Sequence, residues 1–387
     1  MERAQLVPTW RQQPYRILFP LGVVLAWAGV LPWVLFGLDA GEYRLLFHRF
    51  AQAQGFLACF VFGFLFTMIP RRTQTEGPNA TEMAIAVAMP VATTAFAWWR
   101  FWVWSQLCWV ILLGTLLVFI GRRFGAAADG HGPPRSFVLL PVAILMGLVG
   151  SLLVTAGFAG IVSPAVDQLG RLLLLQGTLV ALVLGVGGML LPLITRGVSP
   201  AVSGSGDRPA RRLHLAAALA LIATFAVEVW GSVGLGLALR AAVVAAVLLG
   251  SSRIHRPPTR PGWHRWLVWL SAWCLPVGYA VAALWPDRAQ LGLHVVFIGG
   301  FAQMALSVGL HVALAHSEVE GLAFGRPWQV PAMGVLLLGA MVFRGLVLVA
   351  PERMAAWLAV SGASFLMATA CWAWLALPHT LAGWNRR

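Results

Sequence analysis

Residues 137–158 read FVLLPVAILMGLVGSLLVTAGF and contain no charged side chain. A helix needs about 20 consecutive apolar residues to cross the hydrocarbon core of a bilayer, and this stretch is long enough to do so. Similar apolar stretches, separated by short segments rich in Gly, Pro and Arg, occur along the whole chain. The sequence therefore predicts an all-α, polytopic integral membrane protein.

The composition excludes ordinary soluble classes. The 387 residues are 59% hydrophobic and 10% charged, with a mean hydropathy of +0.81, whereas soluble domains have about 25% charged residues. Every basic residue is arginine, and the formal net charge is +14. Arginine suits lipid phosphate, so this charge predicts the lipid bilayer as a partner and no nucleic acid. The first 15 residues have no apolar segment ending in a cleavage site, so we expect no removable signal peptide.

Turn residues between the apolar runs divide the chain into about twelve expected helices. We expect them at about 16–38, 46–69, 82–98, 103–121, 137–158, 168–193, 213–230, 234–250, 265–285, 290–315, 328–349 and 353–377.

The distribution of arginine predicts the orientation. With the N-terminus inside, the inner loops collect most of the arginines, and few remain outside. The inner set is Arg71, Arg72, Arg122, Arg123, Arg135, Arg196, Arg208, Arg211, Arg212, Arg253, Arg256, Arg260 and Arg326; the outer set is Arg44, Arg100, Arg288 and Arg353. By the positive-inside rule this asymmetry predicts an even number of spans and two cytoplasmic termini.

Two inner loops have the composition of linkers. The loop at 122–136 contains Gly, Asp and a Pro pair, and the loop at 194–212 is rich in Ser, Gly and Arg. The second loop divides a single transmembrane domain, residues 1–387, into two halves of about six helices. No motif repeats between these halves.

Histidine is the main candidate metal ligand. Five of the nine histidines are expected in arginine-rich inner loops or at inner helix ends, with solvated or lipid-facing roles: His131, His255, His264, His214 and His379. The other four are His48, His294, His311 and His316.

His48 begins the second expected helix just inside its outer end, and His294 begins the tenth at a similar depth. If these helices are neighbours, the two imidazoles form either the axial pair of a haem or two ligands of a copper ion. The alternative for each is an interfacial histidine hydrogen-bonded to backbone or water. His311 and His316 lie about 140° apart around a helix, so they cannot chelate one ion together, although each can ligate alone.

Gly55 lies on the same helical stripe as His48, Gln52 and Cys59. A glycine there would let a flat macrocycle approach the backbone. The four cysteines have no CxxC spacing, so we expect them to be small buried hydrophobes.

Glu228, Arg240 and Arg344 are the ionisable residues nearest to helix interiors. Charge inside a membrane is functional by default. The favoured alternative for Glu228 and Arg240 is that they flank a short outer turn around residues 231–236, as ordinary interfacial residues.

Several motifs in one order resemble the NnrS family. They are Pro14-Tyr15-Arg16-Ile17-Leu18-Phe19; His48 ahead of Gly55-Phe56; Gly63-Phe64-Leu65-Phe66-Thr67-Met68-Ile69-Pro70; and Leu293-His294, Gly299-Gly300, Met304 and Leu314-Ala315-His316-Ser317. The resemblance spans most of the chain. It implies a polytopic protein of the bacterial inner membrane that binds haem and copper and is linked to the response to nitric oxide.

The chain departs from the family pattern at identifiable positions. The family usually reads His-x-His-Glu-Met where this chain reads His48-Arg49-Phe50-Ala51-Gln52, so a metal site built on both histidines is not intact. His311 replaces a usual arginine, and a usual histidine of the ninth helix is absent at about Ser271 or Ala272. The chain resembles a divergent member that keeps His48, His294 and His316.

From these patterns and the resemblance together we expect haem of the b type, with or without copper. His48 and His294 are the expected outer ligands, and His316 and His311 are inner candidates. Arg44, Arg49, Arg100 and Arg288 are available to an outer haem propionate; Tyr15 and Arg16 are the nearest equivalents on the inner side. The expected ligand is nitric oxide or a related nitrosyl species, with quinol or another membrane electron carrier as reductant. Whether the protein is an enzyme, such as a membrane oxidoreductase, stays open.

Two alternatives belong to other classes. A cofactor-free transporter or metal-trafficking permease would need broken helices and a polar midplane site, and the polar midplane residues are few. A membrane scaffold subunit with a decayed metal site would explain the missing histidine and glutamate.

Overall fold

The computed structural model describes residues 9–128, 130–198, 208–315 and 325–381. Within these ranges the chain is helical and contains no β-strand. Twelve helical spans are long and apolar enough to cross a membrane, which confirms the predicted all-α, polytopic fold.

In chain order the spans are α2 (Tyr15–Gly37); α3 (Leu45–Phe50), η1 (Ala51–Leu57) and α4 (Ala58–Thr73); α5 (Ala80–Trp98); α6 (Trp102–Gly125); η2 (Arg135–Val138) and α7 (Leu139–Phe158); α8 (Pro164–Leu172), η3 (Leu173–Gly177) and α9 (Thr178–Arg196); α10 (Arg208–Trp230); α11 (Val233–Val247) and η5 (Leu248–Ser252); α12 (Trp263–Leu284); α13 (Gln290–His294), η7 (Val295–Ala302) and α14 (Gln303–Ala315); α16 (Gln329–Val349); and η8 (Pro351–Arg353) and α17 (Met354–Leu381).

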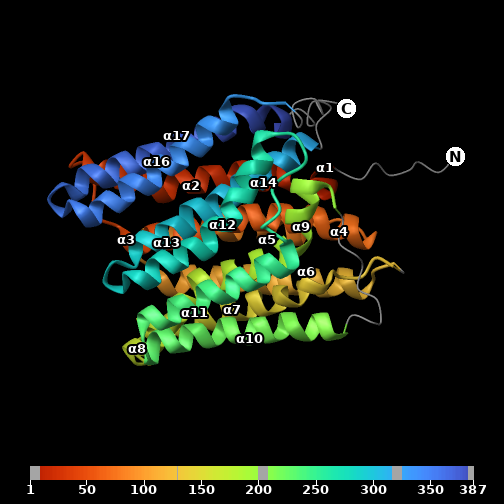
Figure 1. The fold of residues 1–387 in the computed structure, drawn as a ribbon, viewed down its shortest axis with the longest axis horizontal. Helices are drawn as coiled ribbons and strands as arrows, with labels where there is room; N and C mark the ends of the chain where they lie inside the picture. The colour runs from red at the N-terminus through yellow and green to blue at the C-terminus, as the bar shows by residue number, and fades with distance from the viewer. Residues whose placement is uncertain (1–8, 129, 199–207, 316–324, 382–387) are drawn as a thin grey trace.

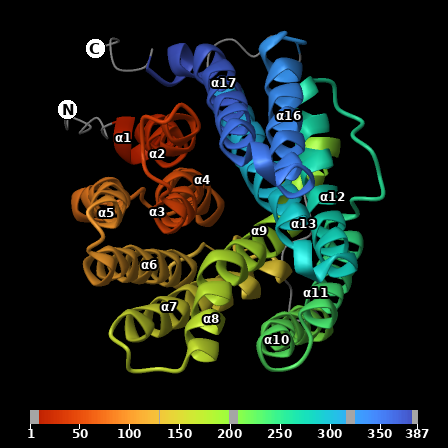
Figure 2. The ribbon, with the colours of Figure 1, turned by 90° about the vertical axis from the view of Figure 1, so that its left-hand side faces the viewer.

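The spans form one bundle and run roughly along its long axis (Figure 1). Seen along that axis, α17 lies between α16 and α2 and packs against both (Figure 2). The start of α2 and the end of α17 meet, because the Arg16 guanidinium donates to the carbonyl oxygens of His379 at 3.1 Å and Thr380 at 2.9 Å. We call this end of the bundle the terminal end and the opposite one the far end.

Three spans form the centre of the bundle. The second, sixth and tenth spans (Leu45–Thr73, Pro164–Arg196 and Gln290–Ala315) have 89%, 78% and 72% of their most apolar window buried, against at most 56% in the others. Each carries a π-helical segment, η1, η3 or η7, and such segments occur frequently at functional sites. The most buried spans thus recur every four spans. The two halves of about six helices remain a prediction.

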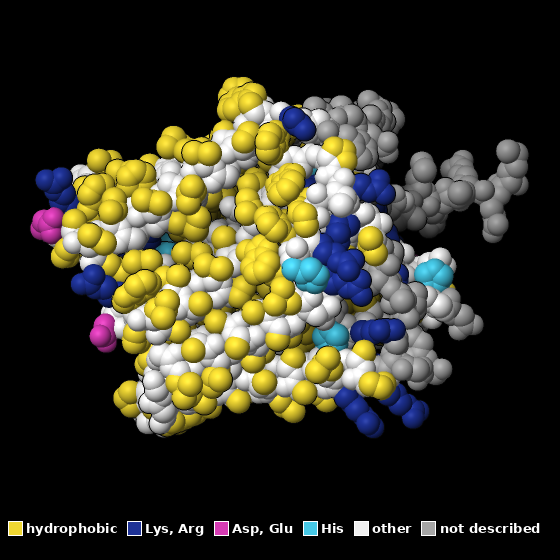
Figure 3. Space-filling model, in the orientation of Figure 1, with side chains coloured by type: hydrophobic (Ala, Val, Ile, Leu, Met, Phe, Trp, Pro, Cys, Tyr) yellow, Lys and Arg dark blue, Asp and Glu magenta, His cyan; other side chains and the backbone are white. Residues whose placement is uncertain are grey.

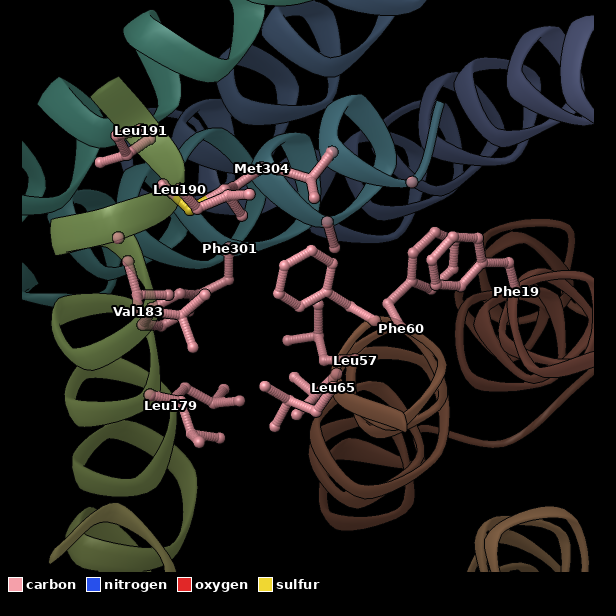
Figure 4. A pocket seen from close by; sticks show the side chains of 18 residues that line it. Phe19, Leu57, Phe60, Leu65, Leu179, Val183, Leu190, Leu191, Phe301 and Met304 are labelled. Atoms are coloured by element: carbon pink, nitrogen blue, oxygen red, sulfur yellow. The ribbon is translucent and has the colours of Figure 1, made fainter. Parts of the chain in front are cut away.

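A cavity of about 100 Å³ lies between these three central spans. Figure 4 shows its walls, with Phe60 on one side, Val183 and Leu190 on α9, and Phe301 and Met304 on the tenth span. Every residue lining it is apolar or glycine. This lining offers no polar side chain, so polar chemistry must be sought elsewhere in the bundle.

The side surface of the bundle is apolar and its two ends are charged (Figure 3). On the face shown, arginine gathers toward the terminal end and the acidic side chains lie at the far end. This is the distribution that the loop arginines predict. It leaves the apolar side surface to contact lipid.

Close backbone contact joins α12 to α13, directly before His294. A Cβ atom at Gly292 would overlap the carbonyl oxygen of Gly278 and the amide nitrogen of Ala282. Gly292→Val should therefore separate the two helices and lower the free energy of unfolding by about 1–3 kcal/mol or more, the cost of overpacking. Thermal unfolding of the protein in detergent measures this loss.

Gly114→Val in α6 is the matched control, since a Cβ there meets no described atom within 4 Å. Equal melting temperatures for the two variants would contradict the tight packing of α12 on α13.

Candidate functional site

His48 lies in α3 at the far end of the second span, where its ring is anchored on α2. Its Nδ1 atom lies 2.9 Å from the carbonyl oxygen of Gly29, and Trp33 packs edge-on against the ring. A carbonyl oxygen only accepts, so Nδ1 carries the hydrogen in the neutral ring. The lone pair is therefore on Nε2.

His294 is the last residue of α13, at the far end of the tenth span. Its Nδ1 atom donates to the carbonyl oxygen of Gln290 at 2.6 Å, one helical turn earlier. Its Nε2 atom accepts a hydrogen bond from Nε of Arg344 in α16 at 3.0 Å. Both histidines thus share one tautomer, with Nε2 as the accepting nitrogen.

The structure brings these two histidines into one electrostatic neighbourhood. His294 interacts through space with His48, and both interact with Arg344 and Arg49. We call these four residues the far-end histidine site. Arg44 and Arg100, also predicted near this end, both pair with Glu42 at 3.1 Å.

The site supplies two imidazoles as metal-ligating groups. Among the described residues, no three His, Cys, Asp or Glu side chains lie close enough to hold a metal ion together. Two imidazoles are the protein ligands that a six-coordinate haem needs, whereas a closed zinc site needs four.

The stripe through His48, Gln52 and Cys59 faces α2. Nε2 of Gln52 donates to the carbonyl oxygen of Ala26 at 3.0 Å, and a Cβ at Gly22 would lie 3.0 Å from Cβ of Cys59. Beside Gly55, Oγ1 of Thr94 occupies the space, 2.7 Å from where a Cβ would be. Gly55 therefore serves the packing of η1 against α5, and this position offers no room for a macrocycle.

A second histidine pair lies at the terminal end. Nε2 of His264 is 3.1 Å from Nδ1 of His311, and the two rings stack. The placement of His264 in a solvated inner loop is wrong: it is the second residue of α12 and only 2% exposed. The error comes from starting this helix at 265, two residues late. His316 lies outside the described residues.

His214 also differs from its prediction. It is 9% exposed, its Nδ1 donates to the carbonyl oxygen of Ala210, and its Nε2 is 2.8 Å from Oγ of Ser251. Both ring nitrogens are therefore engaged: Nδ1 bonds within α10, and Nε2 joins α10 to η5.

Tyr15 and Arg16 lie at the terminal end, so they cannot serve the far-end histidine site. The hydroxyl of Tyr15 and Nε of Arg16 both donate to Oε1 of Gln13. With its bonds to the carbonyls of α17, the Arg16 guanidinium ties the two ends of the chain together.

Glu228 and Arg240 form an ion pair inside the bundle. Nη2 of Arg240 lies 2.6 Å from Oε2 of Glu228, and the exposed fractions of these side chains are 0% and 8%. Arg240 also donates to Thr224 at 3.2 Å and to Gln176 at 3.1 Å. The two do flank a turn, between α10 and α11, but their interpretation as ordinary interfacial residues is wrong, because each helix turns its charge toward the protein.

The twelve spans and the two histidines define a polytopic helical membrane protein with a histidine–arginine site at one end of the bundle. The sequence indicated His48 and His294 but did not connect Arg344 to His294. The position of Arg344, a charged residue within an apolar span, was the feature of the sequence that could have marked it as part of the site.

The chain belongs to the NnrS family: the family model described as NnrS protein matches residues 9–382, nearly the whole chain. No curated protein matches it.

Proposed function

We propose that this NnrS-family protein binds haem of the b type, with or without copper, at the far-end histidine site and uses it to bind or reduce nitric oxide or a related nitrosyl species. The observation that carries the proposal is the electrostatic interaction between His48, near the start of the second span, and His294, near the start of the tenth. The protein would lie in the bacterial inner membrane with both termini in the cytoplasm, which the arginine-rich terminal end supports.

The donor set fits a haem. Each Nδ1 atom is held by a backbone carbonyl, and such a bond orients a ligating imidazole and raises its basicity. The Nε2 atoms of His48 and His294 would hold the iron. Arg344 would have to give up its hydrogen bond to His294 when iron binds there.

The released Arg344, together with Arg49, would hold the propionates. Guanidinium groups pair with carboxylates through two parallel hydrogen bonds, and both arginines interact with the histidines through space. Bound haem would supply one-electron chemistry, with quinol or another membrane carrier as the electron donor, and would take nitric oxide only where one of the two histidines gave way, since two imidazoles fill the positions that the protein provides. The residues' own part is to position the ring and neutralise its charge.

The second candidate is a membrane scaffold or permease without a cofactor. One observation favours it: Arg344 occupies Nε2 of His294, the nitrogen that iron would need. In this case the arginine is a permanent structural partner of the histidine.

An absorption spectrum of the detergent-purified protein distinguishes the candidates. We expect a Soret band, sharp α and β bands after reduction with dithionite, and a shift of the Soret band on adding nitric oxide, with iron and copper measured in the same sample. A folded protein that stays colourless and metal-free after reconstitution with haem would overturn the proposal and favour the scaffold.

A further inference from the structure

A second, much larger cavity opens at the terminal end between α9, α10 and the end of α11. Its volume is about 860 Å³, within the range of about 300–1,000 Å³ typical of ligand pockets. Small side chains create the space, since alanines line the α10 and α11 walls. They are Ala210, Ala216, Ala217, Ala220 and Ala246.

One part of this cavity is strongly cationic. Arg135, Arg196, Arg253 and Arg256 line it, and none of the described residues that line it is acidic. The Arg196 guanidinium is fixed by the carbonyl oxygens of Ser252 at 2.8 Å and Arg256 at 3.1 Å. These acceptors are neutral, so they orient the guanidinium without cancelling its charge.

The remainder of the cavity is apolar and runs into the bundle. Along α11 and η5 it extends from Arg253 to Val243, about 15 Å at the rise of a helix. Its α10 wall continues from Leu213 to Ala220. The cavity thus has a charged part at the end of the spans and a hydrocarbon-like part within them.

We propose that this cavity binds one anionic phospholipid, with the phosphate between the arginines and an acyl chain along the alanines of α10 and α11. Guanidinium groups bind phosphate oxygens in pairs, and basic pockets between transmembrane helices recognise acidic headgroups. A free phosphate ion would satisfy the arginines and leave the apolar part unfilled, so the shape of the cavity favours a lipid. The lipid joins α10 to α9, a role independent of the far-end histidine site.

Native mass spectrometry of the full-length protein tests this assignment. The purified protein is incubated with equal amounts of dioleoylphosphatidylglycerol and dioleoylphosphatidylcholine, and the mass of the adduct that survives activation is recorded. We expect phosphatidylglycerol to be retained preferentially. Arg253→Gln with Arg256→Gln should weaken its retention about thirtyfold, because each basic residue near an acidic headgroup contributes about a five- to sixfold gain in affinity.

The matched control is Arg288→Gln with Arg353→Gln, two exposed arginines at the far end, and it should retain the lipid as the wild type does. Since Arg253 and Arg256 are exposed as well, neither double variant should change the melting temperature. Ala217→Phe, which fills the apolar part and keeps every arginine, should also reduce retention.

Three results would overturn the proposal. Equal retention of the two lipids would remove the role of the headgroup charge. Loss of the adduct on adding inorganic phosphate, with Ala217→Phe behaving as the wild type, would assign the cavity to a free anion. An adduct with the mass of haem, lost in Arg253→Gln with Arg256→Gln, would assign it to a cofactor.

Discussion

Arg240→Leu is expected to lower the free energy of unfolding by about 3–5 kcal/mol, the cost of leaving one member of a buried ion pair uncompensated. Arg240 is fully buried in α11, about 10 Å along the helix from Val233. Its guanidinium pairs with Glu228 and packs 3.8 Å above the Phe225 ring. Leucine removes these contacts and leaves a carboxylate facing hydrocarbon. Thermal or denaturant unfolding of the detergent-purified protein measures the loss.

The double variant Glu228→Leu with Arg240→Leu distinguishes the net contribution of the whole ion pair from the cost of leaving one of its charges unpaired. Replacing a buried pair by apolar groups is often neutral or stabilising, so the double variant should recover most of the stability lost in Arg240→Leu. Arg288→Leu, at an exposed far-end position, should leave the melting temperature unchanged. If Arg240→Leu unfolds at the wild-type temperature, the buried pair is not a stabilising element.

Replacing His48 or His294 with alanine should remove axial ligation and leave the fold intact. This prediction rests on the proposed haem. Changing an outer-shell partner of a metal ligand already costs about 10–100-fold in affinity, so loss of the ligand itself should cost more. We expect either a colourless protein or a spectrum that has lost its six-coordinate, low-spin bands.

His255→Ala, an exposed histidine at the terminal end, is the control and should keep the wild-type spectrum. Size-exclusion chromatography and the melting temperature show whether each variant is folded. A wild-type spectrum in both His48→Ala and His294→Ala would refute their assignment as ligands. In that case the stacked pair of His264 and His311 would be the next site to test.

The twelve spans could be predicted from the sequence because hydropathy acts locally. Any run of about 20 apolar residues must satisfy its backbone hydrogen bonds internally in lipid, and it does so as a helix. Successive spans cross the bundle in opposite directions, so the second and the tenth span begin at the same end. The positions of His48 and His294 near the starts of these spans were therefore enough to place both at one end of the bundle. The resemblance to the NnrS family, now shown over residues 9–382, depended on short motifs in a fixed order.

The errors of prediction all concern which way a polar side chain points. His214, His264 and Glu228 lie near helix ends, where a charged or polar group can face either water or protein, and Arg240 lies about 10 Å along α11. Their partners come from other helices: Ser251 for His214, His311 for His264, and Gln176 for Arg240. Nothing in the local sequence of one helix encodes the rotation of its neighbour.

The sequence by itself determined that this protein is a twelve-span helical bundle. It also determined in which loops the arginines lie and at which end of the bundle His48 and His294 lie. The tertiary structure alone decided that the second, sixth and tenth spans form the centre, that Arg344 reaches His294, and that alanines of α10 and α11 enclose a cavity beside four arginines. The reason is physical. Insertion into lipid depends on the composition of each segment, whereas contacts between spans depend on packing of side chains far apart in the chain, to which the uniform hydrophobicity of the segments gives no guide.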